Sequence, residues 1–176
     1  TITADVEILK HEYRPDFGIP IIGNRPAPVP ISRSYSDPNT PAAFTNKTHI
    51  GFHLDHTFNE SWKLTNRFLA SYLDTEDLWP NPTPAFGTAL QANGRTLNRN
   101  IFGQTSYVRT YATNLDLVGK FSVAETQHKV LIGLDYTRAT TDYFFFGNFN
   151  VSNPALAIDL FNPSYGIDPA LFRAAR

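Results

Sequence analysis

Thr48-His-Ile-Gly-Phe-His-Leu-Asp-His-Thr-Phe58, the short turn Asn59–Ser61 and the returning stretch Trp62–Tyr72 decide the fold. Alternate side chains of a β-strand point to opposite faces. Apolar side chains share one parity in each stretch: Ile50, Phe52, Leu54 and Phe58 in the first, and Trp62, Leu64, Phe68, Ala70 and Tyr72 in the second. Each stretch has 11 residues, and a tilted strand needs roughly 9–11 residues to cross a bilayer. The pattern predicts a transmembrane β-hairpin that is apolar on the outside and polar on the inside.

The rest of the chain continues this pattern with strictly alternating short and long connections. Three further stretches alternate in the same way: Thr1–Tyr13, Tyr107–Phe121 and His128–Thr141. Long segments rich in Pro, Asn and Gly separate them: Pro15–Lys47, Asp74–Arg99 and Asp142–Arg176. Short turns on one side and long loops on the other are typical of outer-membrane barrels. We therefore predict an all-β fold, an antiparallel up-and-down transmembrane β-barrel segment of about five strands with long extracellular loops.

Five strands are too few to close such a barrel, because bacterial barrels begin at about 8 strands. An open sheet edge in hydrocarbon leaves backbone groups without hydrogen-bond partners. The sequence also begins with Thr1 rather than Met. We expect residues 1–176 to be an internal excerpt of a barrel domain that does not include its plug domain.

Composition excludes several classes of function. The chain has 15 Lys and Arg against 16 Asp and Glu, with no basic cluster, so nucleic acid is not an expected partner. It has no Cys, which excludes disulfides and thiolate metal sites within these residues. No Ser-His-Asp arrangement, phosphate loop or zinc-protease motif is present, so we do not expect an enzyme.

One set of polar side chains has two interpretations. His49, His53 and Asp55 share a face, and with His11 they resemble metal ligands. Residues four apart on one strand face are, however, about 13 Å apart. We favour polar side chains that line the lumen, and predict no metal site.

Several local patterns resemble those of TonB-dependent siderophore receptors of the ferrichrome and pyoverdine type. They follow one another in order along the chain: Tyr13–Gly23, His56–Leu64, Gly94–Arg99, Leu117–Phe121 with His128–Tyr136, and Asp159–Gly166. The last of these reads Asp-Leu-Phe-Asn-Pro-Ser-Tyr-Gly, with Ser164 where the family usually has Val. Their order and spacing carry the resemblance more than any single pattern.

This resemblance implies a plugged barrel of about 22 strands in the bacterial outer membrane. It implies TonB-dependent uptake of a ferric siderophore, which is cargo rather than a cofactor. The expected partners are the siderophore, outer-membrane lipid, and the TonB complex through an upstream plug that is absent here.

Loop aromatics and charges are the candidate ligand-binding residues, because aromatic walls suit a large chelate and arginines attract anions. The candidates are Tyr35, Phe44, Trp79, Phe86, Tyr143, Arg95 and Arg99. The run Tyr143–Phe146 also suits an outer aromatic girdle. An alternative for the whole chain is a soluble β-sandwich or carbohydrate-binding module that uses these aromatics for stacking.

Overall fold

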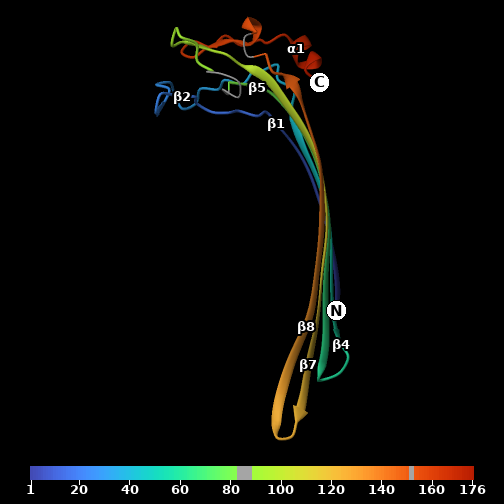
Figure 1. Ribbon diagram of the computed structural model, residues 1–176. Helices are drawn as coiled ribbons and strands as arrows, with labels where there is room; N and C mark the ends of the chain where they lie inside the picture. Colours follow the sequence, from blue (N-terminus) through green and yellow to red (C-terminus); the bar gives the residue numbers. More distant parts are fainter. Residues whose placement is uncertain (83–88, 151–152) are drawn as a thin grey trace. The chain divides into compact units, whose positions relative to one another are not determined.

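The structure is a computed structural model that describes residues 1–82, 89–150 and 153–176. Its elements are β1 (Ile2–Tyr13), β2 (Ile21–Ile22), β3 (Arg25–Pro26), β4 (Ala43–Thr57), β5 (Trp62–Asn81), β6 (Thr96–Leu97), β7 (Asn100–Val123), β8 (Thr126–Asn148), the 3₁₀ helix η1 (Pro154–Leu156), β9 (Ile158–Asp159) and α1 (Pro169–Ala174). The five long strands form one sheet in the order β1-β4-β5-β7-β8 (Figure 1). The predicted antiparallel segment of five strands is confirmed.

Tight turns connect the predicted hairpins. At the first, the Asn59 side-chain oxygen accepts hydrogen bonds from the backbone nitrogens of Ser61 at 2.9 Å and Trp62 at 3.0 Å. At the second, only Ala124 and Glu125 separate β7 from β8, and Ala124 has a positive φ of 54°. An asparagine that bonds its own backbone and a left-handed residue are both ordinary turn chemistry.

The strands extend further toward the long loops than the sequence predicted. Trp79-Pro80-Asn81 was expected to belong to a loop but ends β5, and Tyr143–Phe146 lies within β8. Proline lacks an N–H donor, which is tolerated at the end of a strand better than in its middle. The prediction that the long loop begins at Asp74 was therefore wrong, because β5 continues to Asn81.

Two compact units are distinguished by their contacts. The first comprises Thr1–Lys10, Thr45–Asp74 and Ser106–Asp142. One face of its sheet is apolar and exposed: Val6 is 65% exposed, Ile132 60% and Leu134 60%. Such exposure over a whole sheet face exceeds what an isolated soluble domain normally shows.

Close packing fixes the pairing of strands on this apolar face. The Trp62 ring lies over Gly119, where an added Cβ would come within 2.5 Å of the ring. Tyr72 and Tyr111 pack edge to face and share a hydroxyl hydrogen bond of 2.9 Å. On this face, β5 therefore contributes its even-numbered residues, such as Trp62 and Tyr72, and β7 contributes its odd-numbered residues, such as Tyr111 and Gly119.

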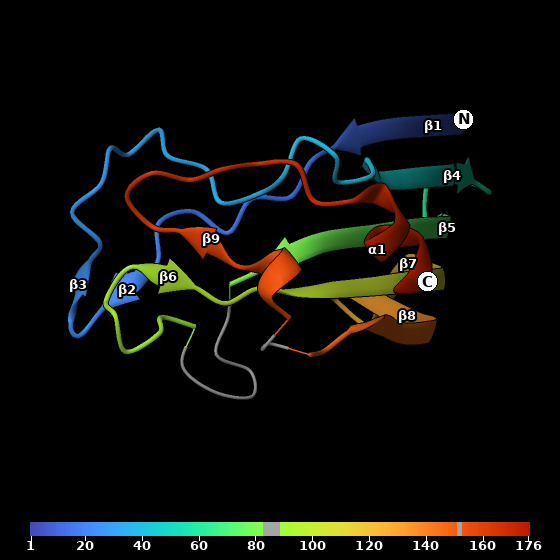
Figure 2. The ribbon, with the colours of Figure 1, turned by 90° about the horizontal axis from the view of Figure 1, so that it is seen from above.

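The second unit comprises His11–Phe44, Thr75–Thr105 and Tyr143–Arg176. Two small cores hold it together. One contains Leu78, Ile101, Leu156, Ile167, Phe172 and Ala175, and the other contains Ala27, Tyr35, Leu97, Ile158 and Leu160. The short helix α1 starts where the Asp168 carboxylate accepts a hydrogen bond from the Ala170 N–H at 2.8 Å. Figure 2 shows β6 beside β9 in this unit, with β2 and β3 forming another small pair.

Among the described residues, no helix is both long and apolar enough to cross a membrane.

Candidate functional site

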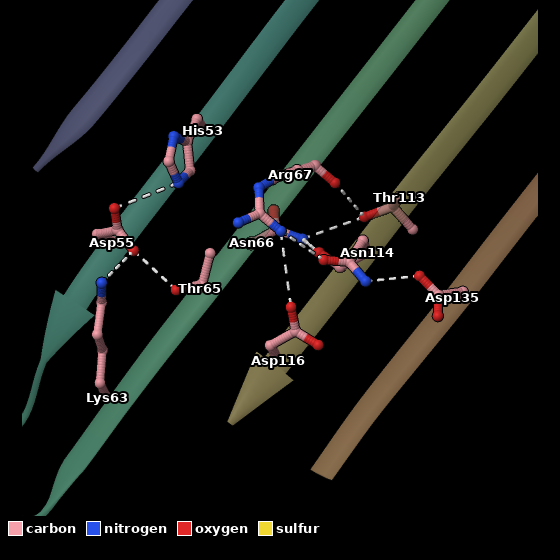
Figure 3. Close-up of polar contacts among 10 residues, drawn as sticks. All are labelled: His53, Asp55, Lys63, Thr65, Asn66, Arg67, Thr113, Asn114, Asp116 and Asp135. Carbon is pink, nitrogen blue, oxygen red and sulfur yellow. Dashed lines mark hydrogen bonds and ion pairs between the residues drawn. The ribbon is translucent and has the colours of Figure 1, made fainter. Parts of the chain in front are cut away.

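Opposite charges neutralise one another along the polar face of the first unit. Figure 3 shows the central part of this arrangement. Asp55 accepts from Lys63 at 2.9 Å and from the Thr65 hydroxyl at 2.7 Å. Between β5 and β7, the Arg67 guanidinium lies 3.6 Å from the Asp116 carboxylate. These groups come from neighbouring strands, because each strand contributes every second side chain to this face.

The same face carries two of the three histidines that were weighed as metal ligands, His49 and His53, whereas His11 belongs to the second unit. His53 Nε2 lies 3.2 Å from Asp55, and His49 lies 3.9 Å from Glu7, which also pairs with Lys47 at 3.3 Å. Within the described residues, no group of three or more His, Asp or Glu side chains is arranged to hold a metal ion. His49 and His53 each lie beside a carboxylate that also contacts a lysine.

In the second unit, a two-residue ladder joins two of the motifs that carried the family resemblance. Thr96 pairs with Asp159 and Leu97 with Ile158. Arg95 forms an ion pair with the Asp159 carboxylate, and its guanidinium lies 5.8 Å from the centre of the Phe161 ring. The pattern Gly94–Arg99 is thereby attached to the pattern that begins at Asp159.

Asp159 also folds its own loop. One carboxylate oxygen accepts from the backbone nitrogens of Phe161 and Asn162, each at 2.8 Å. The Asn162 N–H, and then Arg95, hold the pKa of Asp159 below its usual range because they stabilise the carboxylate. The loop conformation after Asp159 therefore depends on the ionised form.

Arg99 and Tyr35 lie in the interior of this unit. Arg99 is 1% exposed, and its guanidinium donates to the carbonyls of Leu156 at 2.6 Å and Tyr35 at 2.9 Å. Tyr35 is also 1% exposed and donates to the Leu160 carbonyl at 2.7 Å. Burial lowers the pKa of Arg99, while the nearby Asp37 carboxylate opposes that shift. The polar groups of both side chains therefore form hydrogen bonds with backbone carbonyls of the protein itself.

Trp79 belongs to a cluster of aromatic rings. Its ring centroid lies 5.5 Å from that of Phe17 and 5.1 Å from that of Phe102. Phe102 in turn lies 5.4 Å from Phe145. The Trp79 indole N–H is buried and has no hydrogen-bond partner among the described residues. A buried N–H donor without a hydrogen-bond partner lowers the stability of the folded protein, which makes the Trp79 indole a notable group in a candidate binding region.

An apolar groove of about 580 Å³ adjoins this cluster through Phe17. Ligand pockets in proteins commonly enclose about 300–1,000 Å³. Its lining is Phe17, Gly18, Ile19, Pro20, Ile21, Ile22, Gly23, Pro82, Ala89, Leu90 and Leu97. No charged side chain belongs to that lining, so the groove suits the apolar part of a ligand.

The other predicted ligand-binding residues lie elsewhere. Tyr143 is 49% exposed, and its hydroxyl donates to the Gln104 side chain. Phe44 is half-buried in β4. Phe86 lies outside the described residues.

Sequence reasoning missed Phe17 and Phe102 as members of the aromatic cluster. Phe102 was placed outside any strand, so its side of the sheet could not be assigned. Phe145 was grouped with its neighbours, but alternation in β8 separates it from Phe144 and Phe146, which stack on each other at 6.3 Å. Extending the strand pattern back to Asn100 would have identified Phe102.

No protein-family model matches the chain. Two curated receptors resemble it. It is 27% identical over 166 residues, 94% of this chain, to the metal-pseudopaline receptor CntO of Pseudomonas aeruginosa. It is 29% identical over 123 residues, 68% of this chain, to the ferrioxamine B receptor of Salmonella typhimurium. The chain spans 23% of the first relative's length and 16% of the second's.

A solved structure has the same fold. The siderophore receptor PiuA from Acinetobacter baumannii matches with a TM-score of 0.76 and 19% identity, over 94% of this chain and 26% of the other. The resemblance to a partial β-barrel segment of TonB-dependent siderophore receptors is confirmed.

Proposed function

We propose that this chain is part of the barrel of a bacterial outer-membrane receptor for the TonB-dependent uptake of ferric siderophores. The observation that carries the proposal is the two-faced sheet of the first unit. One face exposes branched and aromatic side chains, and the other carries paired charges. This division is the one that a barrel wall between lipid and a polar lumen requires.

The energetics of the two faces favour a lipid environment for the apolar one. Apolar surface removed from water contributes roughly 25 cal/mol per Å². A charged side chain on a lipid face costs about 2–4 kcal/mol near the bilayer midplane. A soluble β-sandwich would have to cover the same face with a second layer, and within the described residues the sheet has no such layer on it.

The second unit supplies the proposed extracellular binding region. The apolar groove and the exposed ring of Phe17, which packs on the buried Trp79, offer surface to a large, partly apolar chelate. Phe17 joins the groove to the rings, so one ligand can touch both. Arg95, about half exposed, offers positive charge at the surface of the same unit.

The chemical class of the cargo rests on the named relatives. One of them is a receptor for metal-pseudopaline and the other for ferrioxamine B. Both names describe a receptor for a metal–chelator complex. We propose more narrowly that the cargo of the protein to which this chain belongs is a ferric siderophore. An upstream plug and the TonB complex would supply gating and energy, and these too are proposals.

Growth under iron limitation tests the proposal. A strain lacking the parent gene should fail to grow on at least one purified ferric siderophore that supports the wild type. The intact gene should restore growth. A panel that includes nickel, cobalt and zinc chelates distinguishes iron from other cargo. Equal growth of the deletion strain on every chelate would refute uptake as the function.

A further inference from the structure

Residues 34–39, in the long segment after β1, form a strap that is hydrogen-bonded to the residues after β9; the two run side by side in Figure 2. The Tyr35 hydroxyl donates to the Leu160 carbonyl at 2.7 Å. In the opposite direction, the Tyr165 hydroxyl donates to the Ser34 carbonyl at 2.8 Å. The partners in these bonds are 125 and 131 residues apart along the chain. The strap therefore joins the first long segment to the last.

Asp37 is the centre of the strap and is only 2% exposed. One of its carboxylate oxygens accepts from the N–H groups of Gly166 at 2.9 Å and Ile167 at 3.1 Å, and the other accepts from the Asn39 N–H at 2.9 Å. The Asn39 side chain in turn donates to the Ile167 carbonyl at 3.0 Å. Hydrogen bonds to an ionised group are stronger than neutral ones, and a buried carboxylate without them is destabilising. Detaching the strap would leave Asp37 in that state.

The segment between β5 and β7 is held by the same residues. The Arg99 guanidinium donates to the Tyr35 carbonyl at 2.9 Å. The Leu160 N–H donates to the Arg95 carbonyl at 2.8 Å. Tyr35 and Leu160, which are bonded to each other, therefore each hold a residue of this segment. All three long segments of the chain meet at the strap.

The apolar groove rests on the core that the strap completes. Tyr35 and Leu160 are buried in this core, and Leu97 belongs to both the core and the groove. Four more residues of the groove lining pack against the same core: Ile19, Ile22, Ala89 and Leu90. Moving one segment away from the others would expose this shared apolar surface to water, which is unfavourable in proportion to the area exposed.

We propose that the strap locks the three long segments into one preformed body, so that the apolar groove has the same shape before and after a ligand enters. The role of the groove in binding a chelate rests on the proposed function, whereas the lock does not. A preformed groove strengthens binding because less conformational freedom is lost when the ligand enters. The first long segment does not close over the groove by itself, because that movement would break the bonds of Asp37.

Hydrogen exchange of the full-length protein in detergent tests the lock without any ligand. Two amides report on different segments: the Ala27 N–H, bonded to the Pro20 carbonyl at 2.9 Å, and the Leu160 N–H, bonded to the Arg95 carbonyl at 2.8 Å. Asp37→Asn weakens the strap and should accelerate exchange of both reporter amides by the same factor, about tenfold, because a locked body opens as one unit.

The pattern of acceleration decides the outcome. In Asp37→Asn, the N–H groups of Gly166 and Ile167 lose their acceptor whether or not the segments are locked. Acceleration confined to these two amides, or shared by only one of the reporter amides Ala27 and Leu160, would show that the segments open separately. Either result would overturn the lock.

Tyr165→Phe repeats the test with a milder change, in case Asp37→Asn does not fold. Tyr165 is 43% exposed, so the variant removes little more than the hydroxyl that donates to Ser34. Both reporter amides should again accelerate by one common factor, about threefold. Asp16→Asn is the matched control, because Asp16 accepts from the Gly18 N–H at 2.9 Å within a single loop, and it should leave both reporter amides unchanged. Unchanged reporter amides in Tyr165→Phe would contradict the lock.

The lock and the proposed function can fail independently, because uptake is measured by growth and the lock by exchange. Segments that open separately in a strain with normal uptake would refute the lock alone. Reporter amides that respond together in a protein that transports no chelate would refute the proposed function and leave the lock intact.

Discussion

Arg95 and Asp159 form an ion pair between segments that are 64 residues apart in the chain. Each belongs to a separate motif that the sequence suggested, and the β6–β9 ladder holds the two motifs together. The backbone N–H groups of Phe161 and Asn162 also donate hydrogen bonds to the Asp159 carboxylate, and these bonds fix the residues that follow Asp159. A single carboxylate thus organises one part of the second unit.

This carboxylate makes the loop sensitive to acid. The folded-state pKa of Asp159 is lowered, so its contribution to stability is complete above the ordinary carboxyl pKa of about 3.9 and is lost as pH falls through the lower folded value. Hydrogen exchange at Phe161 and Asn162 should therefore accelerate below about pH 4. Asp159→Asn should exchange faster at neutral pH and lose the acid-dependent step. An identical pH profile in the variant would contradict this role.

Arg99 should be a stability residue of the second unit. Replacing it with Ala leaves the carbonyls of Leu156 and Tyr35 without their donor, at a cost of about 2–4 kcal/mol. Urea unfolding of the parent protein in detergent, monitored by the hydrogen-exchange protection of backbone amides near Tyr35, measures this loss of stability. Arg25→Ala, at an exposed position of the same unit, is the control and should change stability by less than about 0.5 kcal/mol.

The two faces of the first unit should respond differently to the same charge. Leu134→Arg places a cation on the apolar face and should impair insertion into lipid vesicles by about 2–4 kcal/mol. Thr137→Arg, on the opposite face of β8, should insert nearly as well as the wild type. The fraction of protease-resistant barrel after mixing with vesicles gives both values. Equal loss in the two variants would show that the faces are assigned incorrectly.

The apolar groove should be sensitive to a buried charge. Leu90→Asp places a carboxylate in its lining and should weaken binding of the transported chelate at least tenfold, because the charge must be desolvated by an apolar ligand. Ile31→Asp is the matched control, since Ile31 is 95% exposed and outside the groove. Quenching of intrinsic fluorescence on titration with the chelate measures both affinities. Unchanged affinity in Leu90→Asp would remove the groove from the binding region.

Trp79 and Phe102 should contribute to the same binding. Phe102→Ala removes one ring from contact with Trp79 at 5.1 Å and should weaken chelate binding about tenfold. Phe161→Ala, which removes an aromatic ring of the same unit outside this cluster, serves as the comparison. If the two variants bind equally well, the cluster has a packing role alone.

Periodicity was sufficient to predict the sheet. Strict alternation around Asn59–Ser61 and around the short connection between Phe121 and His128 specified the strands, their faces and the short turns, because the side-chain period of a strand is two. The ends of the strands next to the long loops were less predictable. Pro80 resembles a loop residue, and the aromatic run from Tyr143 has no polar alternation to mark a strand.

The candidate site was harder to predict because long-range contacts determine which loop residues remain accessible. Tyr35 and Arg99 look like surface residues by type, yet their polar groups meet backbone carbonyls from segments far away in sequence. Sequence alone does not give these contacts. The predicted role of Arg95 and Trp79 in ligand binding stays a prediction.

The two-residue turn between β7 and β8 has a consequence for how this sequence tolerates insertions. One residue added within β8 would move Asp135 and its odd-numbered neighbours to the apolar face of the sheet and bring Leu134 to the polar face. Two added residues would restore the faces but separate Asp135 from Asn114. Homologous chains are therefore expected to keep the number of residues between Asn114 and Asp135 constant, while length varies freely in the loops.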